Sequence, residues 1–400
     1  MIICQKKDNY NSTYKFYFII FNHLGSIIMN IPLFEIYNDE EDVKLISEEI
    51  ASGKFWAVGF RVSEFEEKIA DYIGTEHALT FNSGTSALHA ALLAEGIGKN
   101  DEVIVPSFTF ISTVNSPLFV GAKPVFGDIE DETWGLNPDN VQDLINKNTK
   151  AIIPVHYGGC PCKIKELQDI AEDNNLILIE DAAEAFGASV NGKNVGSFGD
   201  VNVLSFCQNK IITTGEGGAI TTDSDEIYEK LKLIRSHGRL ESGDYFSSAN
   251  LFDYIDLGFN WRMSNLTASL GISQITKADK VIELRQNNVK YLSKRLLEQT
   301  DSVTIPEVPE GFNNVYQLFS ILAENRDELI SYLSDNGISS KIYFHPVHQS
   351  EFYKNKLGYD VNLPVTNSIF EKCITLPMFP SLTCEQMDYM AETVGKFYKL

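Results

Sequence analysis

Basic side chains are scarce in this 400-residue chain, which has 33 Lys and Arg against 55 Asp and Glu and a formal net charge of −22. Proteins that wrap a nucleic acid or lie on an anionic membrane need a basic surface, so the composition argues against both classes. A phosphate-bearing ligand is still compatible with it, because one local site can be positive on an acidic protein. We therefore expect no nucleic-acid partner and no membrane partner.

Cysteine is sparse as well. Six cysteines are scattered along the chain, and no Cys-x-x-Cys occurs. Cys160 and Cys162 flank a proline, but two thiols alone make a poor zinc site. The pattern is typical of reduced, mostly buried thiols in a reducing compartment, so we expect a cytoplasmic protein without a metal site.

A membrane-spanning run is also lacking near the N-terminus. The apolar run at residues 16–21 is too short to cross a bilayer. No small-residue cleavage site follows it, which argues against a signal peptide. Met29 opens a stretch that reads like a normal start, Met-Asn-Ile-Pro-Leu-Phe. We hypothesise that residues 1–28 are an N-terminal extension that is disordered or absent from the native protein.

The chain does contain a long alternation of strand-like and helix-like segments. Short apolar runs bounded by turn residues, as at residues 102–105 and 175–179, suit parallel strands that are buried on both faces. Helical spacing of apolar residues separates them, as at residues 85–93. After residue 276 come a long charged helix over 277–297, a strand over 315–322, a helix over 326–336 and a strand over 337–344.

This pattern predicts an α/β fold with two parts. A large domain over residues 29–276 should contain a mainly parallel central sheet flanked by helices, and a smaller C-terminal α/β domain should cover residues 277–400. With 44% hydrophobic residues, a chain of this length can bury two such cores. Open α/β sheets bind ligands at the carboxyl ends of their strands, so candidate site residues should follow the strands.

One such segment, Asn-Ser-Gly-Thr-Ser at residues 82–86, joins a predicted strand to a helix. Gly84 lets the backbone turn closely. The amides of Thr85 and Ser86 then lie at a helix N-terminus, where they could bind an anion. A simple helix cap is the alternative, and for this motif alone it is the commoner role.

Two further segments carry ionisable groups. Glu180 and Asp181 follow the strand at 175–179, where a carboxylate is costly unless it is paired. A pyridinium nitrogen is one partner that would fit, and a helix N-cap is the alternative. Lys210 follows the predicted strand at 201–204, where partial burial would favour a reactive amine. A surface lysine in a glycine-rich turn is the alternative for this residue.

Taken together and in this order, the three segments resemble the sugar aminotransferases of the DegT/DnrJ/EryC1/StrS family, within the aspartate-aminotransferase fold group. The resemblance runs from about residue 31 to the C-terminus. Its other motifs are Pro106-Ser107-Phe108-Thr109-Phe110, Glu180-Asp181-Ala182-Ala183-Glu184-Ala185, Ser205-Phe206 to Lys210 with Gly215-Glu216-Gly217-Gly218, Gly258-Phe259-Asn260-Trp261-Arg262-Met263 and Leu376-Pro377-Met378-Phe379-Pro380.

The resemblance implies that the cofactor is pyridoxal 5′-phosphate and that the fold's large domain binds it. Lys210 would form the Schiff base and later move the proton, and Asp181 would pair with the ring nitrogen. Phe110 would stack on the ring, and Glu184 would lie near its phenolic oxygen. The phosphate would be held by Gly84, Thr85, Ser86 and Ser205.

Sites of this family form at a dimer interface, so the resemblance also implies a homodimer in which Asn260 reaches the neighbouring site. Cys207 stands where many relatives have histidine, which puts one minor contact in doubt. Candidates for the nucleotide-sugar pocket are Trp56, Arg262, Tyr343 and His348, with Arg235, His237 and Arg239 as further basic or titratable groups. For His348 a satisfied structural role is an equal alternative.

The presence of Lys210 bears on the reaction as well. Relatives that dehydrate sugars replace this lysine with histidine, so its presence favours transamination. The expected reaction transfers an amino group from L-glutamate to a nucleotide-linked 4-keto-6-deoxy sugar, as in perosamine-type synthases. The alternatives are a C3 keto-sugar aminotransferase of the same family and a non-catalytic regulator or binding protein with this fold. The intact Lys210 and Asp181 disfavour the non-catalytic alternative.

Overall fold

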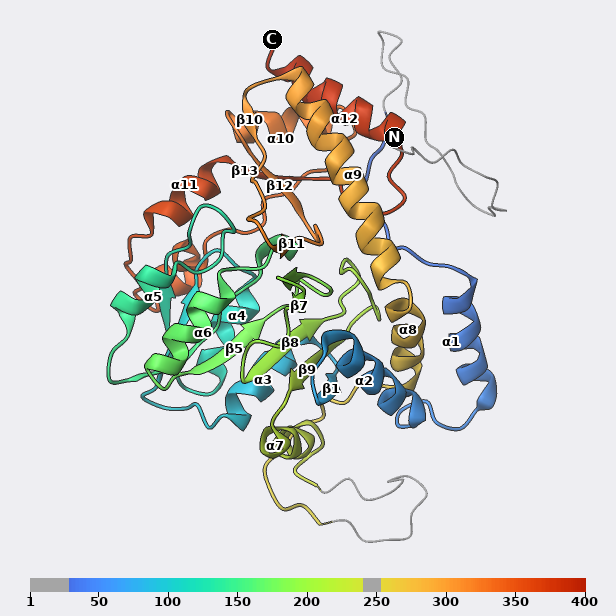
Figure 1. Ribbon diagram of the computed structural model, residues 1–400, viewed down its shortest axis with the longest axis vertical. Coiled ribbons are helices and arrows are strands. Elements are labelled where there is room, and N and C mark those ends of the chain that lie inside the picture. Colours follow the sequence, from blue (N-terminus) through green and yellow to red (C-terminus); the bar gives the residue numbers. More distant parts are fainter. Residues whose placement is uncertain (1–28, 240–252) are drawn as a thin grey trace.

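The computed structural model describes residues 29–239 and 253–400, and a seven-stranded sheet lies at its centre (Figure 1). Six of the strands run parallel to one another, and β9 is antiparallel to both of its neighbours. This confirms the predicted α/β fold with a mainly parallel central sheet. In spatial order the strands are β1 (His77–Phe81), β9 (Gly218–Thr222), β8 (Val201–Ser205), β5 (Ile177–Asp181), β4 (Thr149–Ile152), β2 (Glu102–Pro106) and β3 (Lys123–Gly127).

Helices cover both faces of this sheet, which explains why successive residues of its central strands are buried instead of alternating between buried and exposed. One hydrophobic core lies between the sheet and the helices α2 (Phe60–Ile73), α5 (Pro138–Leu144), α6 (Ile164–Asp173) and α8 (Asn265–Ile275). A second core lies between the opposite face and the helices α3 (Gly84–Ala94), α4 (Ile111–Phe119) and α7 (Asp225–Arg235).

The C-terminal part forms a third core around a smaller sheet. That sheet has the order β10 (Val303–Thr304), β12 (Phe319–Ala323), β13 (Cys373–Leu376). The helices α9 (Ala278–Gln299), α10 (Arg326–Asp335) and α12 (Cys384–Phe397) pack on it, and α11 (Pro364–Lys372) leads into β13. Ile31 also belongs to this core, because it forms a bridge with Ile338. The exact division at residues 276 and 277 remains a prediction, and it falls between α8 and α9.

A third, minor sheet connects the two parts. It pairs β11 (Phe312–Asn313) with β6 (Ser189–Val190), and β6 pairs with β7 (Lys193–Asn194). The segment after β11 therefore starts close to the large sheet before it enters β12. In the described ranges, no helix is long and apolar enough to cross a membrane. The hypothesis about residues 1–28 concerns a segment outside the described residues.

Two strand predictions in the C-terminal part were wrong. The strand expected over 315–322 begins only at Phe319, because the amides of Val315 and Leu318 donate to the carbonyls of Gly159 and Gly158 instead of to a sheet neighbour. The strand expected over 337–344 does not form. In that segment only Ile338 and Lys341 make single bridges, so its backbone pairs at isolated points.

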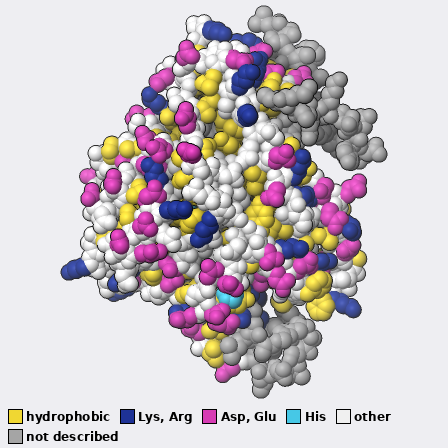
Figure 2. Space-filling view, in the orientation of Figure 1, with side chains coloured by type: hydrophobic (Ala, Val, Ile, Leu, Met, Phe, Trp, Pro, Cys, Tyr) yellow, Lys and Arg dark blue, Asp and Glu magenta, His cyan; other side chains and the backbone are white. Residues whose placement is uncertain are grey.

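On the face seen in Figure 2, acidic side chains are spread across the surface, with Lys and Arg scattered among them. The charge of the chain is thus spread over this surface and does not form one single-sign patch there. Such a distribution favours solubility and does not by itself create a binding site.

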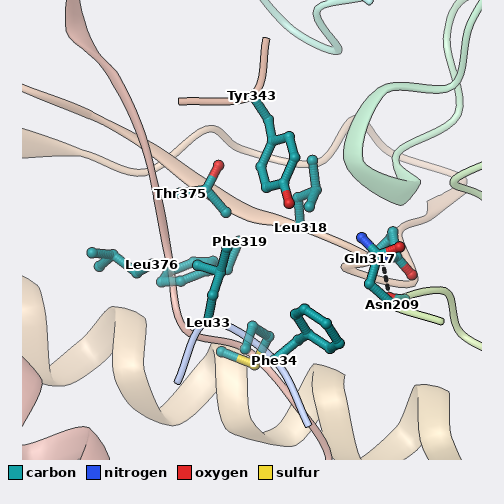
Figure 3. Close-up of a pocket in the computed structure, with 10 residues that line it drawn as sticks. Leu33, Phe34, Asn209, Gln317, Leu318, Phe319, Tyr343, Thr375 and Leu376 are labelled. Atoms are coloured by element: carbon teal, nitrogen blue, oxygen red, sulfur yellow. Dashed lines mark hydrogen bonds between the residues drawn. The ribbon is translucent and has the colours of Figure 1, made fainter. Parts of the chain in front are cut away.

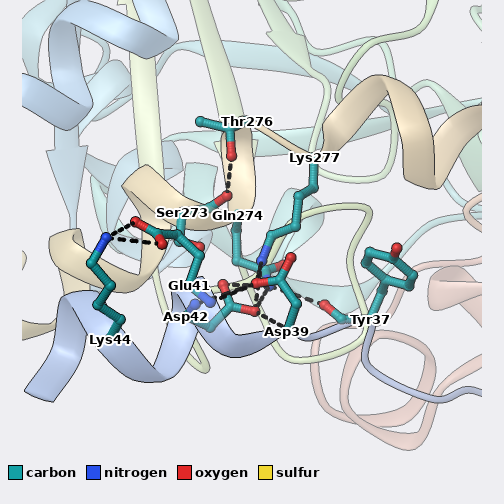
Figure 4. Close-up of polar contacts among 9 residues, drawn as sticks. All are labelled: Tyr37, Asp39, Glu41, Asp42, Lys44, Ser273, Gln274, Thr276 and Lys277. Atoms are coloured by element: carbon teal, nitrogen blue, oxygen red, sulfur yellow. Dashed lines mark hydrogen bonds and ion pairs between the residues drawn. The ribbon is translucent and has the colours of Figure 1, made fainter. Parts of the chain in front are cut away.

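A partly buried charge cluster fixes the first helix, α1 (Glu40–Ser52), to the junction of α8 and α9 (Figure 4). The Lys277 ammonium lies 2.7 Å from a carboxylate oxygen of Asp39 and 2.7 Å from one of Asp42. Gln274 donates to the Asp42 carboxylate at 3.1 Å and to the Tyr37 carbonyl at 3.0 Å. The hydrogen bond from Lys277 holds the pKa of Asp39, the N-cap of α1, below its ordinary value.

We expect Lys277→Met to destabilise the protein by about 1–2 kcal/mol at neutral pH, because it leaves two carboxylates without their cation. A carboxyl group whose folded-state pKa is lowered stabilises the fold above its unfolded pKa and loses this effect as the pH falls through its folded pKa. The difference in unfolding free energy between the wild type and the variant should therefore shrink below about pH 4. Urea unfolding between pH 7 and pH 3 measures it.

Lys44→Met is the matched control, since Lys44 pairs with Glu41 at 3.1 Å on the exposed side of the same helix. Its cost should stay below about 0.5 kcal/mol at every pH. An equal destabilisation by Lys277→Met at pH 7 and at pH 3 would contradict the proposed role of the cluster.

Candidate active site

Lys210 lies in the Lys210 loop, residues 206–217, which connects β8 to β9. The base of this loop is closed by hydrogen bonds from the Phe206 amide to the Gly217 carbonyl at 2.9 Å and from the Thr214 amide to the Phe206 carbonyl at 3.0 Å. Lys210 Nζ lies 3.3 Å from Glu184 Oε1, and its side chain is only 13% exposed. The lysine is thus partly buried and directed at a carboxylate, which argues against the alternative of a surface lysine.

Asp181 is the last residue of β5 and is 3% exposed. The Thr113 hydroxyl donates to Asp181 Oδ2 at 2.8 Å, and the Ala183 amide donates to Oδ1 at 3.2 Å. Burial raises the pKa of Asp181, whereas the Thr113 and Ala183 donors and the nearby Lys210 charge oppose this rise. A cation placed next to Asp181 would favour the charged carboxylate further.

Glu184 follows on the turn after β5 and is also buried. Its Oε2 accepts a hydrogen bond from the Gly158 amide at 2.9 Å, while its Oε1 faces Lys210. The Glu184 charge also raises the pKa of Asp181, so the two carboxylates lie within electrostatic reach of each other. Lys210, Asp181 and Glu184 therefore form one cluster.

The start of α3 has a helix cap and lies close to the end of β8. The Ser83 hydroxyl caps the helix by accepting from the Ser86 amide at 3.1 Å, and the Ser86 hydroxyl donates to Asn82 Oδ1 at 2.6 Å. A Cβ atom on Gly84 would lie 3.1 Å from the Ser205 Cβ, so glycine lets the end of β8 approach the helix closely. The predicted phosphate residues Gly84, Thr85, Ser86 and Ser205 are thus adjacent.

Phe110 occupies the N-cap position of α4, and its ring is 56% exposed. The same helix start carries Ser112, whose hydroxyl bonds that of Thr85 at 2.7 Å, and Thr113, which donates to Asp181. Phe110 thus precedes, in the chain, two residues that contact the α3 start and Asp181, and its ring lies 6.0 Å from the Phe344 ring. An exposed aromatic ring at this position suits stacking on a flat ligand.

Tyr343 approaches the same cluster from the C-terminal part. Burial raises the pKa of its phenol, and the charges of Glu184 and Cys207 add to this effect. Tyr343, Gln317 and Asn209 line a small hollow that is partly open to solvent (Figure 3). Tyr343 therefore shares a hollow with the residue before Lys210 and lies within electrostatic reach of Glu184.

The other predicted binding residues are more dispersed. Trp56 is half exposed, and its indole donates to the Glu49 carbonyl at 3.3 Å. Arg262 donates to the Ser236 hydroxyl at 3.1 Å and bridges Phe81, next to the start of α3. Asn260 is exposed and bridges Ser236.

Two of the candidates have structural partners instead. His348 is buried, bonds the Ser107 hydroxyl through Nδ1 at 2.7 Å and lies edge-on to Phe126, and burial lowers its pKa. These contacts favour the alternative of a satisfied structural histidine. Arg235 is buried and pairs with Glu66 at 2.6 Å, so its charge is already compensated inside the protein.

Sequence reasoning missed several residues that shape the site. Ser112 and Thr113 were detectable, because they are hydroxyl-bearing residues in the first turn of a helix that begins just after Phe110. Gly158 gave no signal, since its role depends on its backbone amide. Glu180 points away from the cluster and accepts from the Phe198 amide at 2.9 Å, so its role is structural.

Comparisons with known proteins agree with this geometry. A model of the "DegT/DnrJ/EryC1/StrS aminotransferase family" matches residues 37–395. The chain is 35% identical to the GDP-perosamine synthase of Escherichia coli O157:H7 over 92% of its own length and 98% of that protein. It is 34% identical to a UDP-N-acetyl-3-dehydro-alpha-D-glucosamine 3-aminotransferase of Acidithiobacillus ferrooxidans over 83% and 87%. The PLP form of Spr1654 from Streptococcus pneumoniae superposes with a TM-score of 0.86 at 26% identity, covering 93% and 99%.

We expect Thr113→Val to raise the pKa of Asp181 further, because one hydrogen bond that stabilises the carboxylate is lost. The carboxyl band in infrared difference spectra, identified with Asp181→Asn, follows this titration. Thr109→Val is the control: Thr109 bonds the Thr113 hydroxyl at 3.0 Å and leaves its bond to Asp181 in place. The same Asp181 pKa in Thr113→Val and the wild type would refute the assignment.

Proposed function

Because the chain belongs to the DegT/DnrJ/EryC1/StrS family of pyridoxal-phosphate-dependent sugar aminotransferases, we propose that it transfers an amino group from L-glutamate to a nucleotide-linked 4-keto-6-deoxy sugar. The observation that carries this proposal is the cluster in which Lys210 Nζ faces Glu184 beside the buried Asp181. A non-catalytic protein would have no need to keep a lysine, a carboxylate and an anion cradle adjacent.

The chemistry of the donor groups fits the cofactor. Asp181 is a buried carboxylate that a cationic ring nitrogen would stabilise. The start of α3, with Thr85, Ser86 and the nearby Ser205, offers amides and hydroxyls to a phosphate. Lys210 would hold the cofactor through Nζ, and the exposed ring of Phe110 would cover its flat face.

Bound pyridoxal phosphate supplies an electron sink for the carbon that loses a proton. The residues of this chain supply the rest. Lys210 Nζ would take the proton from Cα of the amino donor and deliver it to the aldehyde-derived carbon of the cofactor. Glu184 Oε1 orients this amine, and the Gly158 amide holds Glu184 in turn. Asp181 keeps the proton on the ring nitrogen, which maintains the electron sink.

The 4-keto-6-deoxy substrate is favoured by the similarity to GDP-perosamine synthases, which in Vibrio cholerae and Caulobacter vibrioides are 35% and 38% identical to the chain. Tyr343, which is within electrostatic reach of Glu184, would contact the sugar, and Trp56 and Arg262 would contact other parts of the substrate.

We also propose that the enzyme is a homodimer with shared sites. Asn260 is exposed on a segment that lies beside the start of α3. The Asn82 amide, just before α3, donates to the Trp261 carbonyl at 2.8 Å. An exposed amide at this place suits a contact with the cofactor phosphate bound by a second copy.

We expect Lys210→Ala to lower turnover at least about 10³-fold while the fold is retained, because the variant lacks the group that moves the proton. Mass spectrometry should detect amination of GDP-4-keto-6-deoxymannose by the wild type with L-glutamate. Lys230→Ala on α7 is the control, since Lys230 is exposed and pairs with the exposed Glu226 at 2.8 Å.

A panel of GDP-, UDP- and dTDP-keto-sugars separates the alternatives. Amination of a 3-keto UDP-sugar alone would replace the proposed substrate by that of the C3 enzymes. Failure to bind pyridoxal phosphate and to aminate any sugar would support a non-catalytic protein. Full activity of Lys210→Ala would refute the role of the lysine.

For the shared site, we expect Lys210→Ala and Asn260→Ala to complement each other. A mixed dimer contains one site with both an intact Lys210 and an intact Asn260. Random pairing should therefore restore about one quarter of the wild-type sites. Activity after refolding the two variants together measures this, and light scattering should give twice the mass of one chain. A fully active monomer, or no recovery on mixing, would contradict the arrangement.

A further inference from the structure

The segment 315–318 of the C-terminal part lies against the catalytic cluster. The Val315 amide donates to the Gly159 carbonyl at 3.1 Å, and the Leu318 amide donates to the Gly158 carbonyl at 3.0 Å. The amide of Gly158 in turn holds Glu184, the carboxylate that faces Lys210. The segment is therefore one residue removed from one half of the Lys210–Glu184 pair.

Arg285 fixes the backbone of the same segment from the other side. It extends from α9 and is 3% exposed. Its guanidinium donates to the carbonyls of Tyr316 at 3.0 Å and Gln317 at 3.4 Å, and to that of Met378 at 3.0 Å. Held on both sides, the backbone of residue 317 has little freedom, so the direction of its side chain is defined.

The Gln317 side chain reaches the other half of the pair. Its Nε2 donates to the carbonyl of Asn209, the residue before Lys210 (Figure 3). Gln317 is 4% exposed, and its Oε1 is buried without a hydrogen-bond partner. Burying an unpaired acceptor is unfavourable. The hydrogen bond donated by Nε2 is therefore the polar contact that stabilises this side chain.

Asn209 is only half-buried, so packing restrains it less than it restrains the residues that follow Lys210. It lines two small hollows, and Lys210 lines the second of them. After Lys210, by contrast, Ile211 and Ile212 are buried and well packed. A directional hydrogen bond, rather than close packing, therefore sets the orientation of the peptide that enters Lys210.

We propose that Gln317 is a positioning residue that orients Lys210 through the Asn209 carbonyl. The inference rests on the proposed role of Lys210 and adds a new one for Gln317. Through Gln317 and Gly158, the segment 315–318 supports both members of the Lys210–Glu184 pair. The C-terminal part thereby helps to set the distance between the Lys210 amine and the Glu184 carboxylate.

The test is Gln317→Met, which keeps the length of the side chain and lacks the donor. We expect kcat to fall about 10-fold, the loss of one well-placed hydrogen bond, with the KM values for L-glutamate and sugar changed less than about 2-fold. The melting temperature should hardly change, because the variant also removes the unpaired oxygen. Gln317→His should recover most of kcat, since an imidazole N–H can donate at a similar reach.

A second measurement needs no cofactor. In the cofactor-free protein, reductive methylation of Lys210, followed by peptide mass spectrometry, should be several-fold faster in Gln317→Met than in the wild type. Lys163, which pairs with Glu130 and Glu132, is the internal reference. Should Gln317→Met melt early, Gln317→Leu provides the same two measurements.

Gln286→Leu is the matched control variant. Gln286 also extends from α9 and donates to Asn313 Oδ1 at 2.8 Å and to the Asn314 carbonyl at 2.9 Å, but its bonds end in the segment before 315. Its kcat and its Lys210 labelling should match the wild type. An active wild type together with unchanged kcat and labelling in Gln317→Met would overturn the inference, and so would equal effects of the two glutamine variants. An inactive wild type without bound cofactor would instead overturn the proposed function.

Discussion

The carboxylate of Asp181 is buried at the end of β5, and the arrangement of its neighbours follows from the need to keep it charged. A buried carboxylate without partners takes up a proton, because desolvation penalises the charged form. Here the donors come from three elements: Thr113 from α4, Ala183 from the turn after β5, and the charge of Lys210 from the loop after β8. Stabilising the charged form of Asp181 thus depends on groups from three segments.

The register of the central sheet makes this convergence possible. Asp181 pairs with Val203 across β5 and β8, so Ser205 and the Lys210 loop begin just beyond the Asp181 end. Because β9 is antiparallel, the chain returns at the same edge of the sheet, and Gly218 pairs with both Ser205 and Phe81. A Cβ atom on Gly218 would lie 2.6 Å from the Gly84 nitrogen, so only glycine lets the α3 start and the lysine loop meet.

Much of this could be predicted from the sequence. Apolar strands bounded by turn residues gave the parallel sheet, and the rule that ligands bind at strand ends selected Gly84, Asp181 and Lys210. The antiparallel β9 was not predicted, because Gly-Gly-Ala-Ile-Thr-Thr reads equally well as part of a turn. His348 could not be assigned, since a histidine beside apolar residues suits either a core or a pocket.

Residues that act through their backbone or through partners distant in the chain could not be predicted from the sequence. Gly158 supports Glu184 with an amide that every residue except proline possesses, so its type carries no signal. Gln317 lies 107 residues from Lys210 in the chain and meets Asn209 only because β12 begins later than its apolar pattern suggests. The amides and carbonyls of segment 315–318 do not pair within the sheet. They bond Gly158, Gly159 and Arg285 instead and so connect the segment to the site.

The acidity of the chain is compatible with an anionic substrate for a related physical reason. At physiological ionic strength, exposed charges are screened beyond about 8 Å, so the scattered acidic side chains act weakly on a ligand inside the site. Within that range the carboxylates of Asp181 and Glu184 are already engaged by amides, a hydroxyl and Lys210. A phosphate bound at the start of α3 would lie where the helix dipole is positive. Local donors therefore decide binding, and the net charge chiefly affects solubility and the rate of encounter.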